Sequence, residues 1–457
     1  MPPRSRFTHS KTLLALLLLD AVATMLVFNV VAHFRGVTGH AVVAPLLGPL
    51  AALVFAIYLI DGYRVRTDMM SLDYTSLHLI AGGAAMLTIL LLTFVVLPHG
   101  YELQSSRSVI VLSFLILIPL TLSYRRLQHQ RRLAFIGGRS LIFLGDREGC
   151  EAFREECNTM GTWQPVIHCP IHPPADGKAD VLSQPFAEAL AAMQEGSLAV
   201  DAIVMRDIAR QLQPELAQQL VQLHFQGIPT LTLKQFYQLN WQKVPVAGLD
   251  PMWLFQDGFQ IAREPVFERL KRASDVFLSA LGLLVAAPVI AVAGLAILAG
   301  DGRPVIFRQK RIGLNRQPFS LLKLRTMKVG SRGDDLYTLP GDARITPVGR
   351  LLRTTRIDEL PQLWNVLRGD MSLIGPRAEW DLLVERYERE IPCYHFRHLV
   401  KPGITGWAQV NYPYGSNLDD TIRKLEYDLY YIQNFSFTLD ASIFLKTIHV
   451  MILGRGR

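Results

Sequence analysis

The sequence has few cysteines for its length and no cysteine pattern that would hold a metal or a disulfide framework. Among 457 residues there are four. They lack the paired spacing of zinc ligands, and their density is far below that of a disulfide-stapled secreted domain. We therefore expect reduced thiols, as in the cytosol, and no zinc site. The cysteines are Cys150, Cys157, Cys169 and Cys393.

Two cofactor and catalytic signatures are also missing. Gly145 and Gly149 follow an apolar strand candidate, but the full Gly-x-Gly-x-x-Gly pattern is absent, so dinucleotide binding is disfavoured. No tyrosine has a lysine four residues later. This absence argues against a membrane-bound nucleotide-sugar dehydratase, which would need such an acid/base pair. Internal repeats and low-complexity tracts are absent as well.

Long apolar runs are abundant, since half of the residues are hydrophobic. The first run contains Asp20, lacks a small-residue cleavage site and is followed by further runs, so it is not a removable signal peptide. Each run is about long enough to cross a ~30 Å hydrocarbon core. They predict a four-helix transmembrane bundle within residues 1–132. The runs occupy residues 13–34, 41–61, 76–97 and 108–123.

Basic residues are distributed unevenly around these runs. The loops expected outside the cell hold only Arg35 and Arg107, whereas the other flanks hold many, so the positive-inside rule places both ends of the bundle in the cytoplasm. The net charge of +8 suits a protein that meets anionic lipid or phosphorylated substrates, and charge alone also permits nucleic acid. The cytoplasmic basic residues are Arg4, Arg6, Lys11, Arg64, Arg66, Arg125, Arg126, Arg131 and Arg132.

Residues 133–264 have the composition of a soluble module followed by a connector. Strand candidates at 141–144, 202–205 and 228–233 alternate with helical stretches, which predicts an α/β unit with a parallel sheet. We interpret it as a Rossmann-like module with a regulatory or scaffolding role. The proline-containing segment from about 236 to 265 is the connector.

A fifth apolar run, within about 272–300, is interrupted by Pro288. Lys271 and Arg272 flank one end, and further basic residues flank the other, so both ends should be cytoplasmic. A proline removes a helix hydrogen bond and kinks the helix. A re-entrant membrane helix therefore fits better than the alternative, a fifth spanning helix with a kink.

The remainder, to residue 457, is soluble-looking. Apolar and basic residues alternate at 307–313 and 319–327, which suits half-buried strands or interfacial elements that present cations. A turn-rich segment running into a strand is expected at 401–410. Helices are predicted at 380–397, 425–435 and 441–453.

An adjacent carboxylate pair, Asp358 and Glu359, lies among arginines just before apolar residues at helical spacing, with Pro361 suited only to a first turn. A helix N-terminus favours anions, including phosphate. Cations around carboxylates are what phosphoryl chemistry needs. The plainer alternative is that Asp358 caps an ordinary helix and the arginines form solvated ion pairs.

An ordered series of motifs from about 265 to 457 resembles the bacterial sugar transferases, the monotopic polyprenyl-phosphate glycosyl-1-phosphate transferases. With the bundle and module ahead of it, the chain is similar to large members that initiate exopolysaccharide, capsule or O-antigen units. We thus expect a mostly helical catalytic domain at 265–457. The motifs are Lys271-Arg272-x-x-Asp275, Pro288, Phe307-x-Gln309-x-Arg311-x-Gly313, Lys323-x-Arg325-Thr-Met327, Asp358-Glu359-Leu-Pro-Gln, Asn365-Val-Leu-x-Gly-Asp-Met-Ser-Leu-Ile-Gly-Pro-Arg377 and Lys401-Pro-Gly-Ile-Thr-Gly-Trp.

The resemblance implies transfer of a sugar-1-phosphate from a UDP-sugar to undecaprenyl phosphate, with release of UMP. It implies that Asp358 is the covalent nucleophile and that Glu359 acts with Mg²⁺. It further implies a bacterial cytoplasmic membrane protein whose catalytic domain lies on the cytoplasmic face, a homodimer, and no nucleic-acid partner. A carboxylate nucleophile and cations that stabilise the transferring oxygens agree with this chemistry.

Position within the motifs makes four cations candidates for phosphate contacts, each with a surface ion pair as its alternative. Asp275 is expected to cap or tether the re-entrant helix through Lys271 or Arg272. The chain departs from many family members at Ala287, where they have serine, and at Ala378, where they have proline. A non-enzymatic scaffold for polysaccharide export is the second rival. The candidate cations are Lys323, Arg325, Arg353 and Arg377.

Overall fold

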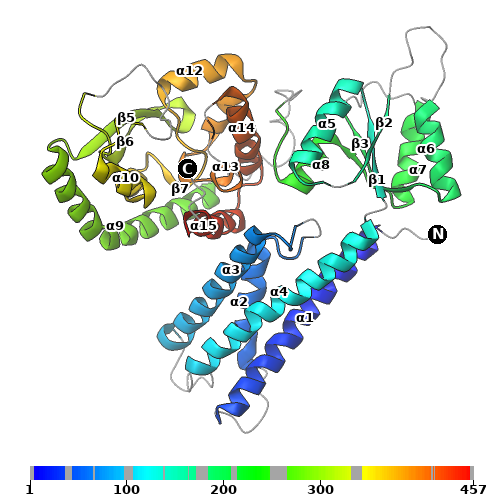
Figure 1. Ribbon diagram of the computed structural model, residues 1–457, viewed down its shortest axis with the longest axis horizontal. Coiled ribbons are helices and arrows are strands. Elements are labelled where there is room, and N and C mark those ends of the chain that lie inside the picture. The colour runs from blue at the N-terminus through cyan, green and yellow to red at the C-terminus, as the bar shows by residue number, and fades with distance from the viewer. Residues whose placement is uncertain are drawn as a thin grey trace. The chain divides into compact units, whose positions relative to one another are not determined.

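The computed structural model divides into two compact units, Met1–Gln242 and Lys243–Arg457. Unit 1 holds long helices and a parallel sheet, and unit 2 holds a long helix, a hairpin and shorter helices (Figure 1). The residues that the structure describes are 5–36, 44–64, 67–96, 107–136, 139–162, 164–170, 184–206, 214–246, 265–330, 342–412, 415 and 417–452.

Four helices of the described residues are long and apolar enough to cross a membrane, by length and composition. Three lie within α1, α3 with η2, and α4, and the fourth lies within α9 of unit 2. The predicted second crossing is shorter than expected, because α2 has 13 residues and spans only about 20 Å. The unit 1 helices before the sheet are α1 (Ser5–Phe34), η1 (Ala44–Leu46), α2 (Leu47–Leu59), α3 (Leu72–Leu91), the π-helical turn η2 (Leu92–Val96) and α4 (Arg107–Ile136).

A fully buried ion pair joins α1 to α4. Arg125 donates from Nη2 to Asp20 Oδ2 at 2.6 Å, and both side chains are completely buried. The hydroxyls of Tyr63 and Tyr124 also donate to the Asp20 carboxylate. Because a buried charge is tolerated only when paired and hydrogen-bonded, this cluster fixes how the two helices pack.

The predicted parallel sheet is confirmed, with four strands in the order β2-β1-β3-β4. Strand β2 was not expected. One face packs against α5 and α8, and the other against α6 and α7 (Figure 1). Helix α8 occupies the start of the predicted connector, whose residues 247–264 lie outside the described part. The elements are β1 (Arg139–Leu144), α5 (Arg147–Thr159), β2 (Val166–Cys169), α6 (Gln184–Glu195), β3 (Ala199–Met205), α7 (Pro214–Phe225), β4 (Thr230–Thr232) and α8 (Leu233–Trp241).

The first helix of the described part of unit 2 is α9 (Pro265–Asp301), a single 37-residue helix that contains Pro288. Its ribbon changes direction part way along its length (Figure 1). Many of its large apolar side chains are exposed, including Leu284, which is 74% exposed. Of the two alternatives for the segments of alternating apolar and basic residues, the structure has strands, which form an antiparallel hairpin of β5 (Ile306–Ile312) and β6 (Pro318–Leu324).

The rest of unit 2 surrounds two short parallel strands, β7 and β8. The segment expected to run into a strand at 401–410 instead forms β8 and then helix α13. The principal core gathers aromatic residues of α12, η8, α13 and α14, among them Tyr394, Trp407 and Tyr431. The elements are η6 (Leu314–Arg316), α10 (Pro347–Thr354), η7 (Ile357–Glu359), α11 (Gln362–Arg368), β7 (Ser372–Ile374), α12 (Asp381–Glu390), η8 (Tyr394–Leu399), β8 (Gly403–Thr405), α13 (Trp407–Asn411), α14 (Leu418–Gln433) and α15 (Phe437–Ile452).

Candidate active site

The acidic pair lies in the short turn η7, directly before α11, as the sequence predicted. The side chain of Asn365 in α11 makes two hydrogen bonds to the backbone of strand β6. Its Oδ1 accepts from Leu322 N at 3.0 Å, and its Nδ2 donates to Ser320 O at 2.8 Å. This amide is buried, so its bonds to the strand backbone are shielded from water. These hydrogen bonds fix the position of Lys323, the residue after Leu322 in β6, opposite turn η7.

Glu359 is held by three cations. Lys323 donates from Nζ to Glu359 Oε1 at 2.9 Å, and Arg377 Nη2 lies 3.3 Å from the same oxygen. Arg356 Nη1 approaches the other oxygen, Oε2, at 3.7 Å. The Glu359 side chain is only 12% exposed, so these contacts act in a medium that screens charge less than water does.

Asp358 is buried beside Glu359 but is bound differently. The residue is 7% exposed, and its Oδ1 has no hydrogen-bond partner among the described residues. It also caps no helix, because Pro361 stands at the N-cap of α11 without a side-chain hydrogen bond. A buried carboxylate oxygen without a partner is rare, and it leaves a lone pair available for a ligand or a reaction.

The two carboxylates have pKa values shifted in opposite directions. Burial and the neighbouring Glu359 raise the pKa of Asp358, against the cations Lys323 and Arg353. Burial also acts to raise the pKa of Glu359, but Lys323, Arg377 and Arg356 outweigh it and hold that pKa well below its usual range. Carboxyl groups whose environments separate their pKa values can take different roles.

The four predicted phosphate-contact cations are not all placed together. Lys323 and Arg377 contact Glu359, and Arg353 donates from Nε to Thr326 Oγ1 at 2.9 Å while acting on Asp358 through its charge. Arg325 instead donates to the carbonyl oxygens of Asp301 and Gly302, both at 2.8 Å. Its guanidinium thus caps the C-terminal end of α9.

The loop that carries Arg377 is packed backbone against backbone. A Cβ on Gly403 would lie 2.1 Å from Gly375 N, and one on Gly406 would lie 2.1 Å from Gly375 O. Gly403 N also donates to Pro376 O at 2.9 Å. Only residues without a side chain permit this approach, which fixes the position of Arg377.

A buried charge network supports the same loop from behind. Arg397 Nη2 donates to Arg377 O and to Asp428 Oδ2, both at 2.9 Å. Tyr394 Oη accepts from Arg397 Nη1 at 2.5 Å. The side chains of Arg397 and Asp428 are 6% and 2% exposed. The network ties α14 to the backbone of a residue in the site.

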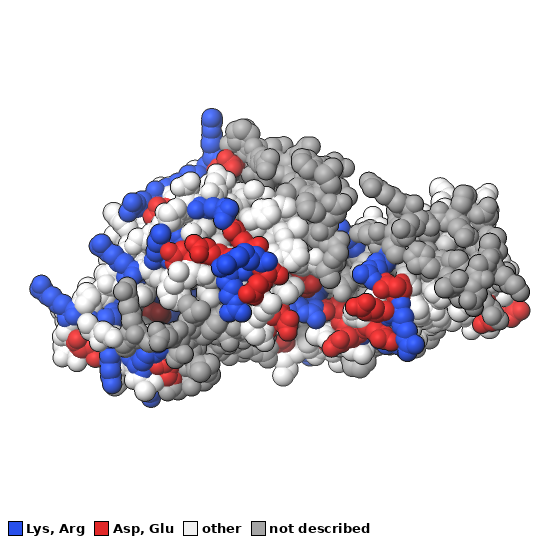
Figure 2. All heavy atoms as spheres, turned by 90° about the horizontal axis from the view of Figure 1, so that it is seen from above, with Lys and Arg blue, Asp and Glu red and all other residues white. Residues whose placement is uncertain are grey.

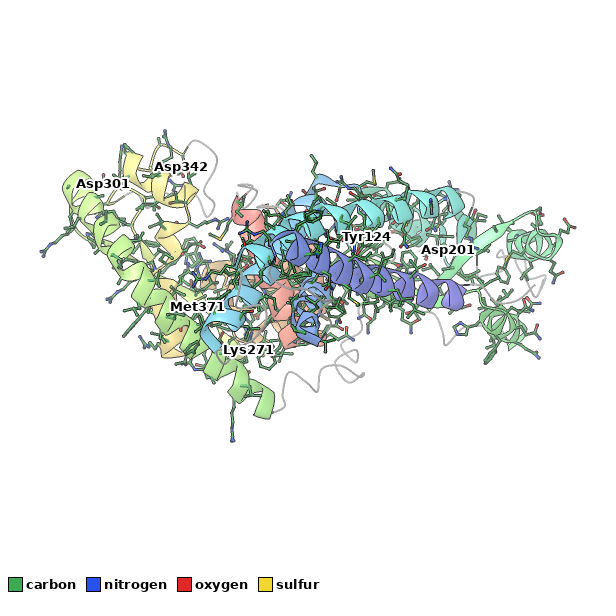
Figure 3. All side chains as sticks on the ribbon, turned by 90° about the horizontal axis from the view of Figure 1, so that it is seen from below. Tyr124, Asp201, Lys271, Asp301, Asp342 and Met371 are labelled. Carbon is green, nitrogen blue, oxygen red and sulfur yellow. The ribbon has the colours of Figure 1, made fainter. Side chains whose placement is uncertain are left out.

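Three of the four predicted membrane-helix residues contact the rest of unit 2, whereas Pro288 is exposed. Lys271 pairs with Asp440 at 2.5 Å, and Arg272 donates to the carbonyl oxygens of the last turn of α11. Asp275 Oδ1 accepts from Leu373 N at 3.1 Å, a partner other than the predicted Lys271 or Arg272. Lys271 and Asp301 lie toward opposite ends of α9 in Figure 3. Both ends of this helix are therefore attached to the same unit.

Sequence reasoning missed Arg397, Asp428 and Asp440 as supports of the site. A usable signal was present, because Asp428 interrupts a stretch of α14 whose neighbours are all buried. A charged residue on the buried face of a helix requires a partner. The pattern does not say which partner, since Arg397 and Asp428 are separated by 31 positions.

Lysine and arginine side chains cluster around the acidic pair. Acidic and basic side chains are interspersed on the face seen in Figure 2. Within the described ranges, no group of three or more His, Cys, Asp or Glu side chains is arranged to hold a metal ion. Two buried carboxylates among four cations form an arrangement that suits the binding of phosphate groups.

Comparison with known proteins gives the family. A model described as bacterial sugar transferase matches residues 266–454. A Rhizobium leguminosarum exopolysaccharide production protein is 39% identical over 199 residues, which cover 41% of this chain and 97% of the relative. The chain therefore belongs to the bacterial sugar transferase family, as its motifs predicted.

Two longer relatives are named for an activity. An Aeromonas hydrophila UDP-N-acetylgalactosamine-undecaprenyl-phosphate N-acetylgalactosaminephosphotransferase is 37% identical over 262 residues, 57% of this chain and 61% of the relative. An Escherichia coli UDP-glucose:undecaprenyl-phosphate glucose-1-phosphate transferase is 43% identical over 183 residues, 39% of each chain. The matched part thus spans less than two thirds of either relative's length.

Proposed function

We propose that this protein transfers a sugar-1-phosphate from a UDP-sugar to undecaprenyl phosphate and releases UMP, as the first membrane step of exopolysaccharide, capsule or O-antigen assembly. The observation that carries the proposal is the buried Oδ1 of Asp358, which lacks a partner and lies beside a Glu359 already held by cations. The names of the relatives supply the substrate classes.

In the first step, an oxygen of Asp358 attacks the phosphorus linked to the sugar. The bond from that phosphorus to the bridging oxygen breaks, and its electron pair leaves with UMP. In the second step, an oxygen of the lipid phosphate attacks the same phosphorus, and Asp358 leaves as a free carboxylate. No proton is consumed, and the bond between the sugar carbon and its oxygen stays intact, so the sugar configuration is retained.

The surrounding cations suit this displacement. Lys323 and Arg377 neutralise Glu359 on one side of the nucleophile, and Arg353 acts on Asp358 through its charge. Prearranged cations stabilise negative charge on the transferring oxygens. Arg325 supports the site indirectly, because it holds the end of α9 from the strand that also carries Lys323.

Magnesium is part of the proposal, with Glu359 as the protein ligand. Mg²⁺ is commonly bound through one or two carboxylates together with substrate phosphates. Glu359 Oε1 faces Lys323 and Arg377, whereas Oε2 lies 3.7 Å from Arg356 Nη1, beyond hydrogen-bond distance. Bound at Oε2, the ion would neutralise charge on the diphosphate.

We also propose that α9 enters the membrane and returns to the same side. Lys271, Arg272 and Asp275 anchor its first part to unit 2, and Arg325 caps its last residue, Asp301. A helix anchored at both ends to one domain cannot cross the bilayer unless that domain lies on both sides. The basic flanks of the helix support a position of this domain on the cytoplasmic face.

The test is direct detection of the intermediate. The purified protein, incubated with UDP-sugars one at a time, should release UMP and gain the mass of a phosphosugar on Asp358, which peptide mass spectrometry locates. Asp358→Asn should abolish the adduct, whereas the exposed Asp419→Asn should leave it unchanged. An adduct on another residue, or turnover by Asp358→Asn, contradicts the assignment. A non-enzymatic scaffold would give no UMP at all.

A further inference from the structure

Arg356 occupies an unusual backbone conformation next to the site. Its φ is 59° and its ψ is 13°, in the left-handed region, and it stands at the N-cap of η7. Residues that carry a Cβ seldom adopt this conformation, and when they do they concentrate at functional sites. The conformation turns the chain so that Arg356 and Glu359 face each other across 3.7 Å.

The cations around Glu359 fall on two sides of its carboxylate. Lys323 and Arg377 contact Oε1, whereas Arg356 approaches Oε2. The side chain of Lys323 is 18% exposed and that of Arg356 is 35% exposed. Arg356 therefore faces a more open part of the site than Lys323 does.

The positive charges in the site outnumber its two carboxylates. Asp358 and Glu359 contribute two negative charges, and Lys323 and Arg377 alone would balance them. Arg353 and Arg356 also act on Asp358 through their charges. Arg377 lies on the Oε1 side of Glu359 and Arg353 is hydrogen-bonded to Thr326. Arg356 lies on the Oε2 side with a side chain that is 35% exposed, so an incoming anion can reach it there.

We infer that Arg356 binds the phosphate that departs with the nucleoside, on the side of Glu359 opposite Lys323 and Arg377. This inference rests on the proposed function. A sugar nucleotide has two phosphates joined by one oxygen, and two groups of cations separated by one carboxylate match that arrangement. The guanidinium has a fork of donors that suits phosphate oxygens.

The role follows from where charge develops. When Asp358 attacks, the electron pair of the breaking bond goes to the bridging oxygen, which becomes a phosphate oxygen of the leaving UMP. Arg356 neutralises this charge in the first step. The second step, attack by the lipid phosphate, contains no nucleotide and does not require Arg356.

The experiment measures the two half-reactions of the full-length protein separately. UDP-sugar without lipid phosphate reports UMP release, and the isolated phosphosugar protein mixed with undecaprenyl phosphate reports the second step. Arg356→Asn removes the charge and keeps a residue that tolerates the left-handed region. We expect the KM for UDP-sugar and the UMP concentration for half-inhibition each to rise at least about tenfold, with the second step unchanged.

Three variants control the result. Arg356→Gly should behave like Arg356→Asn, since glycine adopts this backbone freely. Arg356→Lys should retain part of the UMP binding, and Arg350→Gln, at an exposed arginine of α10, should match the wild type. UMP inhibition unchanged in Arg356→Asn, or equal losses in both half-reactions, overturns the inference alone. A wild-type protein that releases no UMP overturns the proposed function and this inference with it.

Discussion

Lys323 donates from Nζ to Oε1 of Glu359 across 2.9 Å, and this contact joins strand β6 to turn η7 inside the site. Glu359 is thereby neutralised in place, while the adjacent Asp358 keeps one buried oxygen without a partner in the described structure. Two neighbouring carboxylates thus have different environments, and their responses to pH should differ.

The pH dependence of UMP release should reflect Asp358. Its pKa is raised above 3.8 by burial and by Glu359, so the nucleophile gains a proton, and activity falls, as the pH drops through that raised pKa. In Glu359→Gln one cause of the shift is gone, and the acid limb of the residual activity should move to lower pH. If the acid limb of the Glu359→Gln pH profile lies at the same pH as that of the wild type, Glu359 does not act on Asp358.

Acid stability should depend on Glu359. Its pKa is lowered from 4.5 in the folded protein, so its contribution to stability is full above the unfolded value and is lost as the pH falls through the folded pKa. Glu359→Gln should therefore flatten the acid side of the stability profile below about pH 4.5. Thermal unfolding in detergent across pH 3–7 measures this.

Arg397→Met should be strongly destabilising, by about 3–5 kcal/mol, because it leaves the buried Asp428 carboxylate without its cation. The double variant with Asp428→Asn should regain most of that loss. Arg386→Met, in the exposed pair with Glu390, is the matched control and should cost less than about 1 kcal/mol. Denaturant titration followed by circular dichroism gives the three values.

Gly403→Ala should disturb the loop of Arg377. The added Cβ would meet Gly375 N at 2.1 Å and Thr405 O at 2.4 Å, and both are backbone atoms that cannot swing aside. We expect a loss of about 1–3 kcal/mol together with weaker UDP-sugar binding. Gly300→Ala, whose Cβ would lie 3.7 Å from Val348 Cγ2, should be tolerated. Equal effects of the two changes would contradict the close-packing argument.

Labelling of single cysteines tests the path of α9. Arg269 lies in the first part of α9 and Arg308 lies after its last residue, and both side chains are exposed. Each is replaced in turn by cysteine. The four native cysteines are buried, so their labelling should be weak. In sealed inverted vesicles a membrane-impermeant reagent should modify both positions from the cytoplasmic side. Modification of the two from opposite sides would establish a spanning helix instead.

Local sequence patterns were sufficient where structure depends on neighbours in the chain. The alternation of apolar and basic residues was compatible with strands at β5 and β6 but did not predict their pairing, and the acidic pair before Pro361 was expected at a helix start. The plainer alternative for Asp358, a helix cap, fails for a local reason too. A cap bonds the N–H two or three residues later. Pro361, three residues later, has no N–H, and the N–H of Leu360, two residues later, is donated to Ile357 O.

Other features depend on contacts that no local pattern encodes. The pairs Lys271–Asp440 and Arg397–Asp428 join residues far apart in sequence. Strand β2 is only four residues long and contains His168, so it lacks a clear strand pattern. The left-handed backbone of Arg356 was equally invisible, because arginine is not a residue that signals such a turn.

The attachment of α9 at both of its ends has a mechanical consequence. Lys271, Arg272 and Asp275 hold its first part, and Arg325, which directly follows strand β6, holds its last residue. Because β6 also carries Lys323, a displacement of the apolar helix is transmitted to a cation that holds Glu359.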